Sequence, residues 1–115
     1  MTPLLEILMI VAVGAVTMYD FLIYDQIVRR EFRELPAEWA KDGKPIGFFW
    51  VPKGGNIWTG SSARTRTVIW WAVLAPEWAQ SRGDMRSLFI RLKIATVAYL
   101  SLFILIFVVF AVAPR

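Results

Sequence analysis

The longest uncharged stretch of this sequence, residues 94–113, constrains the fold more than any other feature. Its twenty residues include no charged residue, no glycine and no proline. A helix rises about 1.5 Å per residue, so this stretch would be about 30 Å long, which matches the hydrocarbon thickness of a bilayer. We therefore expect a second transmembrane helix within the closing segment, residues 91–115.

A first apolar run covers residues 3–28. No Lys or Arg precedes it, unlike the start of a secretory signal. Only thirteen uncharged residues separate Glu6 from Asp20. They make about 20 Å of helix, so a span must continue to Tyr24 and take Asp20 into the membrane. The sequence predicts that residues 1–28 form the first transmembrane helix.

Asp20 belongs to a polar stripe on this first helix. At about 100° per residue, five positions fall within about 60° of one another: Glu6, Val13, Thr17, Asp20 and Tyr24. A carboxylate at membrane depth costs about 2.5–3.5 kcal/mol, so the stripe should face protein or water. Asp20 is then either an acid that relays protons or binds a cation, or one half of an ion pair. We expect interhelical ion pairing among Asp20, Asp25, Arg91 and Lys93.

The basic residues predict the topology. Twelve of the thirteen Lys and Arg residues lie between Arg29 and Lys93, and the net charge is +4. The positive-inside rule then places the central segment in the cytoplasm and both termini in the periplasm. We expect a multi-pass protein of the bacterial inner membrane, cytoplasmic or intracytoplasmic.

The central segment, residues 29–90, carries signals for short helices. Pro36 ends the extended first helix and starts a short one that stops at Gly43. The glycines, prolines and asparagine of residues 43–62 favour turns and no long regular element, with a later helix capped by Ser61 or Ser62. Pro76 begins another short helix.

The predicted fold class is an all-α membrane protein. Two antiparallel transmembrane helices are joined by a small, loop-rich, Trp-rich cytoplasmic segment with short helices. The chain contains 57% hydrophobic residues, which exceeds what a soluble domain of 115 residues would bury.

All six tryptophans lie in this basic segment and outside both apolar runs. Trp prefers the membrane–water interface, where its ring is dry and its N–H is hydrated. We expect anionic lipids as partners of this surface. A nucleic-acid platform also combines aromatic and basic residues, but it would not explain two spans. The predicted interface anchors are Trp50, Trp58, Trp70, Trp71 and Trp78.

The chain contains no histidine and no cysteine. Their absence removes the usual ligands of zinc, haem and magnesium-tetrapyrroles, the commonest general base, and the usual nucleophile pairs. We therefore expect no enzymatic activity, no metal and no ligated cofactor. Contacts with a lipid, a quinone or a pigment stay open.

One face of the second span is aromatic. Four of its residues lie within about 80° on a helical projection, with a threonine close by. The face suits a partner helix, a pigment or a quinone tail; the alternative is a lipid-facing side, which tolerates Phe as readily as Leu. The predicted contact residues are Thr96, Tyr99, Phe103, Phe107 and Phe110.

The order of these features resembles a known family. Asp42-Gly43 is followed by Gly47-Phe48-Phe49, and an arginine-rich lead precedes the last apolar helix. This layout resembles the small two-span bacterial membrane proteins called universal stress protein B. The spacing between the two motifs differs here through Lys44-Pro45-Ile46. The resemblance implies a two-span topology and no biochemical role.

Two spans bury little area against each other, so the polar stripe, the aromatic face and the Trp-rich segment all favour neighbours. We expect a non-catalytic accessory subunit of a larger inner-membrane complex, contacting other integral membrane subunits. By analogy, an energy-transducing assembly, photosynthetic or respiratory, is the favoured host. Two alternatives stay open: a free-standing stress-related or lipid-sensing protein, and a small proton- or ion-conducting homo-oligomer using Asp20.

Overall fold

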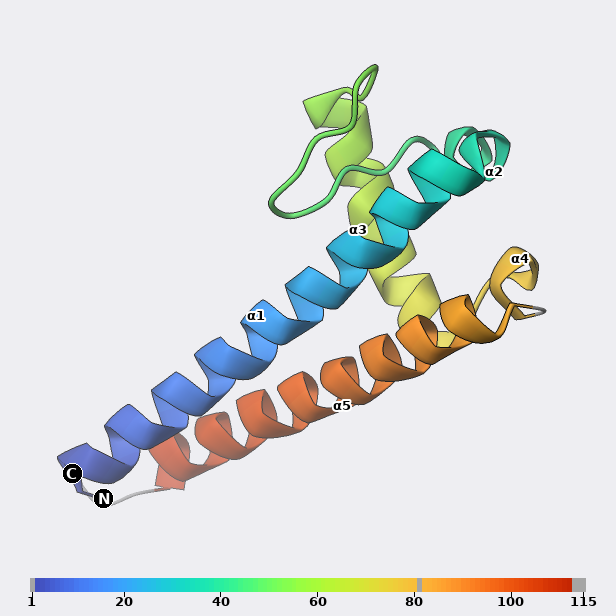
Figure 1. Ribbon diagram of the computed structural model, residues 1–115. Helices are drawn as coiled ribbons and strands as arrows, with labels where there is room; N and C mark the ends of the chain where they lie inside the picture. The colour runs from blue at the N-terminus through green and yellow to red at the C-terminus, as the bar shows by residue number, and fades with distance from the viewer. Residues whose placement is uncertain (1, 81, 113–115) are drawn as a thin grey trace.

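The computed structural model describes residues 2–80 and 82–112. The residues 113–115 of the expected second span, including Arg115, lie outside this part, as does Met1. Helices account for most of the described chain (Figure 1), in the order α1 (Pro3–Glu34), α2 (Pro36–Lys41), α3 (Ile57–Val73), α4 (Glu77–Gln80) and α5 (Gly83–Val112).

The two long helices, α1 and α5, run antiparallel and pack side by side, so that Pro3 and Val112 lie at the same end (Figure 1). Both are long and apolar enough to span a membrane, with mean hydropathies of 2.0 and 2.7 over their most apolar windows. Only 11% and 6% of the residues in those windows are buried within the chain. The two helices therefore leave most of their apolar surface uncovered.

Local sequence signals account for the ends of α1. The Thr2 hydroxyl accepts the Leu5 N–H at 3.2 Å, and Pro3 occupies the first turn, where a missing N–H costs nothing. Pro36 then follows the end of the helix at Glu34, as predicted. The short helices α2 and α4 also follow the two predicted proline signals.

Helix α3 is longer than the sequence predicted. The Asn56 side chain caps it by accepting the N–H groups of Trp58 and Thr59 at 2.8 and 3.2 Å. The helix therefore begins at Ile57, and the prediction of turns through residue 62 and a serine cap was wrong. Gly60 lies inside the helix, and no side chain fits at this position because a Cβ would come within 2.5 Å of Ile46 Cγ2. Close packing, not a turn, explains this glycine.

The core lies where α3 crosses the pair formed by α1 and α5. Trp71 of α3 is at its centre, with ring centroids 5.5 Å from Tyr24 and 5.3 Å from Phe89. Ile27 and Leu92 are fully buried beside this cluster. The predicted fold class is confirmed: two long apolar helices pack together, joined by a Trp-rich segment of short helices.

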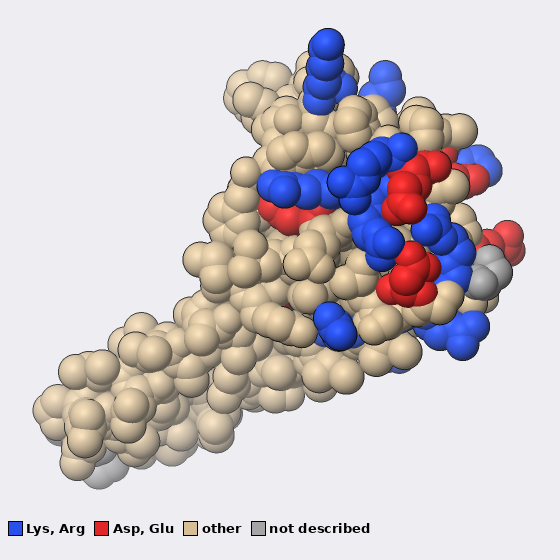
Figure 2. Space-filling model, in the orientation of Figure 1, with Lys and Arg blue, Asp and Glu red and all other residues tan. Residues whose placement is uncertain are grey.

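The charged residues divide the molecule into two parts. On the face that Figure 2 shows, Lys, Arg, Asp and Glu gather where α2, α4 and the adjoining ends of α1 and α5 meet. The half that carries Pro3 and Val112 presents no charge on this face. We call the first part the charged end and the second the apolar half.

Candidate functional site

The candidate site is a cleft between α1, α3 and α5, which we call the Asp20 cleft. It has a volume of about 360 Å³. Apolar side chains form most of its wall, and Thr17, Asp20 and Thr96 lie among them together with the amphipathic Tyr99. The cleft thus combines an apolar surface with a few polar groups, a composition typical of binding sites.

Asp20 is the only acidic residue that lines this cleft in the described chain. Its side chain is buried, with 8% of the residue exposed. The Thr96 hydroxyl lies 3.4 Å from both carboxylate oxygens, at the long limit of a hydrogen bond. The carboxylate therefore has room for a second, stronger donor within the cleft.

The predicted ion pairing of Asp20 and Asp25 with Arg91 and Lys93 was wrong. Within the described residues, Arg91 and Lys93 form no ion pair. Thr96 and Arg91 are five residues apart, about 140° around α5, so the two side chains leave the helix in different directions. Arg91 instead lines a separate cavity beside Tyr19.

Asp25 holds the loop that follows α2. Its two carboxylate oxygens accept the backbone N–H groups of Phe48 and Phe49 at 2.6 and 2.8 Å. A Cβ on Gly47 would come within 2.8 Å of that carboxylate, so only glycine fits there. Arg64 closes the arrangement by donating to the Gly47 carbonyl at 3.0 Å and by lying 4.6 Å from the Phe48 ring centroid.

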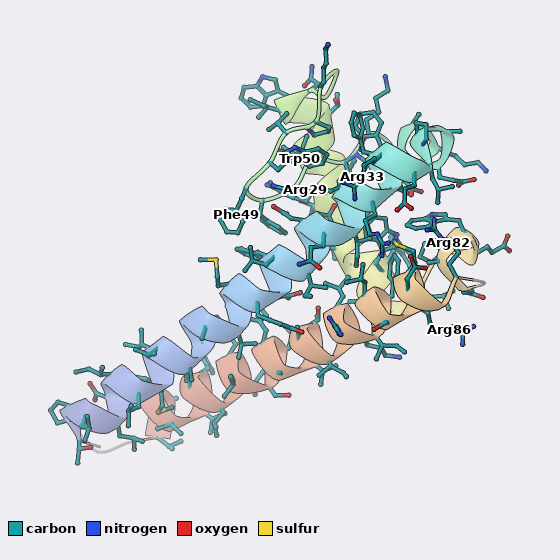
Figure 3. All side chains as sticks on the ribbon, in the orientation of Figure 1. Arg29, Arg33, Phe49, Trp50, Arg82 and Arg86 are labelled. Atoms are coloured by element: carbon teal, nitrogen blue, oxygen red, sulfur yellow. The ribbon has the colours of Figure 1, made fainter. Side chains whose placement is uncertain are left out.

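The ion pairs between the long helices lie farther toward the charged end. Arg30 contacts Asp84 at 2.8 Å, and Arg82 contacts Glu34 at 3.1 Å. The hydrogen bond from Arg82 holds the pKa of Glu34 below its usual value. Figure 3 shows Arg82 just before the start of α5, opposite the end of α1. Arg82 and Glu34 are 48 residues apart in the sequence, so the local charge pattern did not predict their contact.

A buried acidic pair lies inside the charged end. Glu31 is fully buried, and within the described residues no N–H or hydroxyl donor reaches either of its carboxylate oxygens. Burial first, and then a hydrogen bond and repulsion from the Asp42 carboxyl, raise its pKa to about 10. A pKa this high favours the protonated form of the Glu31 carboxyl, which could then donate to the neighbouring carboxyl of Asp42.

The five predicted tryptophan anchors separate into three groups. Trp58 and Trp70 are 86% and 64% exposed, so both rings are available to an interface. Trp50 and Trp78 are half-buried against other aromatic rings. Trp71 is 5% exposed and belongs to the core, so its prediction as an anchor was wrong. Neighbours on a helix differ by about 100°, which sends Trp70 outward and Trp71 inward.

The predicted aromatic contact face extends beyond the Asp20 cleft. Thr96 and Tyr99 line the cleft, whereas Phe103 and Phe107 are exposed farther along α5. Phe110 is half-buried near the end of the described helix. Sequence reasoning missed the contribution of α3, whose Val68, Ile69, Ala72 and Val73 form the opposite wall. Their run of apolar residues in a basic segment was the available signal.

Comparisons with protein-family models, curated proteins and solved structures find no match to this chain. The resemblance to universal stress protein B stays a prediction. The functional argument therefore depends on the geometry of the chain itself.

Proposed function

We propose that this protein is a non-catalytic accessory subunit of a larger assembly in the bacterial inner membrane. Helices α1 and α5 span the bilayer, and the charged end lies on the cytoplasmic side with both termini in the periplasm. A partner's transmembrane helix docks in the Asp20 cleft. The protein stabilises its neighbours through helix contacts and through its membrane-surface segment.

The Asp20 cleft is the observation that carries this proposal. A carboxylate that faces hydrocarbon costs about 2.5–3.5 kcal/mol, and one long contact with Thr96 offsets little of this. A partner helix with a hydroxyl, amide or cationic side chain would supply the missing donor. It would also cover Ile69 and Val73, which are exposed on the α3 side of the cleft.

The identity of the host assembly is inferred by analogy. Small two-span subunits suit energy-transducing complexes, photosynthetic or respiratory, where they pack against larger subunits. Without histidine or cysteine, this chain would contact a quinone or pigment tail rather than ligate a cofactor. The free-standing lipid-sensing protein remains the second candidate, and the exposed arginines near the membrane boundary favour it.

Photo-cross-linking in native membranes tests the proposal. A photoreactive amino acid replaces Leu100, which lines the Asp20 cleft, or Leu105, which lies about 140° away on the same helix. The two leucines are matched in exposure, at 51% and 53%. We expect a discrete protein adduct from position 100 and mainly lipid adducts from position 105.

Copurification completes this test. A tagged full-length chain extracted in mild detergent should bring a stoichiometric membrane partner, and Asp20→Leu should weaken that association. A chain that emerges alone and forms only lipid adducts at both positions would overturn the accessory-subunit proposal. Adducts only with itself, together with ion flux that Asp20→Asn abolishes, would favour the conducting homo-oligomer.

A further inference from the structure

The side of the α1–α5 pair that carries Arg91 has two cavities, one above the other along the helices. The first, of about 370 Å³, lies between Tyr19 of α1 and Ile94 of α5, with Arg91 at its edge toward the charged end. The second, of about 390 Å³, lies farther toward the charged end between the arginines of α1 and Leu88 of α5. The first cavity is mainly apolar and the second is more polar. Together they suit an amphiphile, which has an apolar tail and a polar headgroup.

Helical geometry makes the two cavities parts of one surface. On α1, Gln26, Arg29 and Arg33 follow one another at spacings of three and four, so they share a face. On α5, Leu88 and Arg91 are three residues apart and likewise share a face. The polar cavity therefore continues into the apolar one along both helices.

Three arginines on this surface are unpaired. Within the described residues, Arg29, Arg33 and Arg91 form no ion pair, and all three are exposed. Arg30 also lines the polar cavity, but Glu34 and Asp84 neutralise it at 3.3 and 2.8 Å. Figure 3 shows Arg29 and Arg33 on α1 beside the loop that carries Trp50. The Arg29 guanidinium carbon lies 5.3 Å from the Trp50 ring centroid, which limits its motion.

The position of these cations matches a lipid headgroup layer. Residue 94 begins the uncharged part of α5, and Arg91 and Leu88 lie about 4.5 and 9 Å beyond it along the helix. The headgroup layer extends about 5–8 Å beyond the hydrocarbon core on each side of a bilayer. Arg91 thus lies at phosphate depth and the apolar cavity at acyl-chain depth, whereas Arg29 and Arg33, which line the polar cavity with Leu88, lie at the outer edge of the headgroup layer.

We propose that this surface binds one anionic phospholipid of the cytoplasmic leaflet. Arg91, Arg29 and Arg33 contact its phosphate and headgroup, and an acyl chain fills the apolar cavity beside Tyr19. The site rests on the membrane placement in the proposed function. It does not depend on the Asp20 cleft, which opens on another side of the helix pair.

Native mass spectrometry of the full-length chain in a neutral detergent tests this site. The probes are phosphatidylglycerol and phosphatidylcholine with identical acyl chains. We expect one phosphatidylglycerol to be retained in preference to phosphatidylcholine. Each arginine near an anionic lipid contributes about fivefold in affinity, so replacing all three should weaken binding about a hundredfold.

Two charge-matched variants decide the interpretation. The test variant carries Arg29→Gln, Arg33→Gln and Arg91→Gln. The control carries Lys41→Gln, Lys44→Gln and Lys53→Gln, which removes the same charge from other exposed positions. The double variant Arg33→Gln, Arg91→Gln keeps the contact of Arg29 with Trp50, in case the triple variant does not fold. We expect selective lipid binding to survive only in the control.

Three results would overturn the lipid site. These are equal retention of the two lipids, equal loss in the test and control variants, and displacement by glycerophosphate as effective as displacement by the intact lipid. The last would indicate a free-phosphate site without a role for the acyl chain. If the chain copurifies with no partner but still binds the lipid selectively, only the accessory role is refuted. If the chain does not enter membranes, the membrane placement on which both proposals depend is refuted.

Discussion

Replacing Glu31 by glutamine tests the electrostatics inside the charged end. Glu31 is fully buried, and its carboxyl faces that of Asp42 rather than a cation. Burial and the Asp42 carboxyl raise its pKa from 4.5 to about 10. Glutamine has the same shape and carries no charge, and its amide N–H₂ can donate to the neighbouring carboxyl of Asp42. Glu31→Gln should therefore preserve the fold.

The sign of the pH dependence follows from proton binding. Between pH 4.5 and about pH 10, the folded protein holds a proton on Glu31 that the unfolded chain has lost. Stability from this group is therefore fully present below pH 4.5 and decreases as the pH rises toward 10. Each pH unit corresponds to about 1.4 kcal/mol, so the folded state loses about 3 kcal/mol between pH 5 and pH 7.

The measurement is thermal unfolding in detergent micelles, followed by circular dichroism, at pH 5, 6 and 7. Relative to Glu31→Gln, the native chain should lose stability steadily as the pH rises, and the variant should be the more stable protein at pH 7. Glu77→Gln supplies the control, because Glu77 is an exposed residue of α4 and the chemical substitution is the same. The control should change stability by less than about 0.5 kcal/mol.

Parallel pH profiles for the native chain and Glu31→Gln would refute this reasoning. They would mean that Glu31 is ionised in the folded state and has a cationic or water partner. A variant less stable than the native chain at pH 7 would lead to the same conclusion. Either outcome would require a different arrangement of Glu31 and Asp42.

Two further substitutions test how the central segment is attached to α1. Asp25→Asn replaces one acceptor oxygen by an N–H₂ group, which leaves one of the Phe48 and Phe49 N–H groups unpaired. The free energy of unfolding should fall by about 2 kcal/mol. Unchanged thermal stability would argue against this contact. Tyr24→Phe removes the hydroxyl that lies 2.7 Å from Thr67 of α3, and the free energy of unfolding should fall by about 1 kcal/mol. Amide hydrogen exchange should then become faster in α3 than in α5. A uniform change in exchange along both helices would contradict that attachment.

The long helices could be predicted because their signals are local. Continuous apolar runs, Pro36 and Pro76 each act within a few residues, so α1, α2, α4 and α5 follow from the sequence. The length of α3 could not be obtained in this way. Gly60 appears in the sequence as a helix breaker, and its actual role depends on Ile46, fourteen positions earlier.

Partners of buried charges were the least predictable feature. The Asp25 carboxylate could contact either a cation or backbone N–H groups. A sequence shows which residues are cationic, but it does not show which backbone N–H groups will face a carboxylate. The pairing expected with Arg91 failed for this reason. The Gly47-Phe48-Phe49 motif was visible, and the structure explains its glycine by the close approach of the Asp25 carboxylate.

The two sides of the α1–α5 pair differ in a way that gives the proposals a common basis. On one side α3 forms a wall beside Asp20, and the carboxylate there favours a hydrogen-bond donor or a cation. On the other side, Arg91 and Arg33 form no ion pair with any residue that the structure describes, and they favour an anion. In the proposed membrane placement, the bilayer offers anionic headgroups at the depth of Arg91, whereas it offers no donor at the depth of Asp20. With that placement, lipid can satisfy the arginine side, and we expect protein to supply the donor on the Asp20 side.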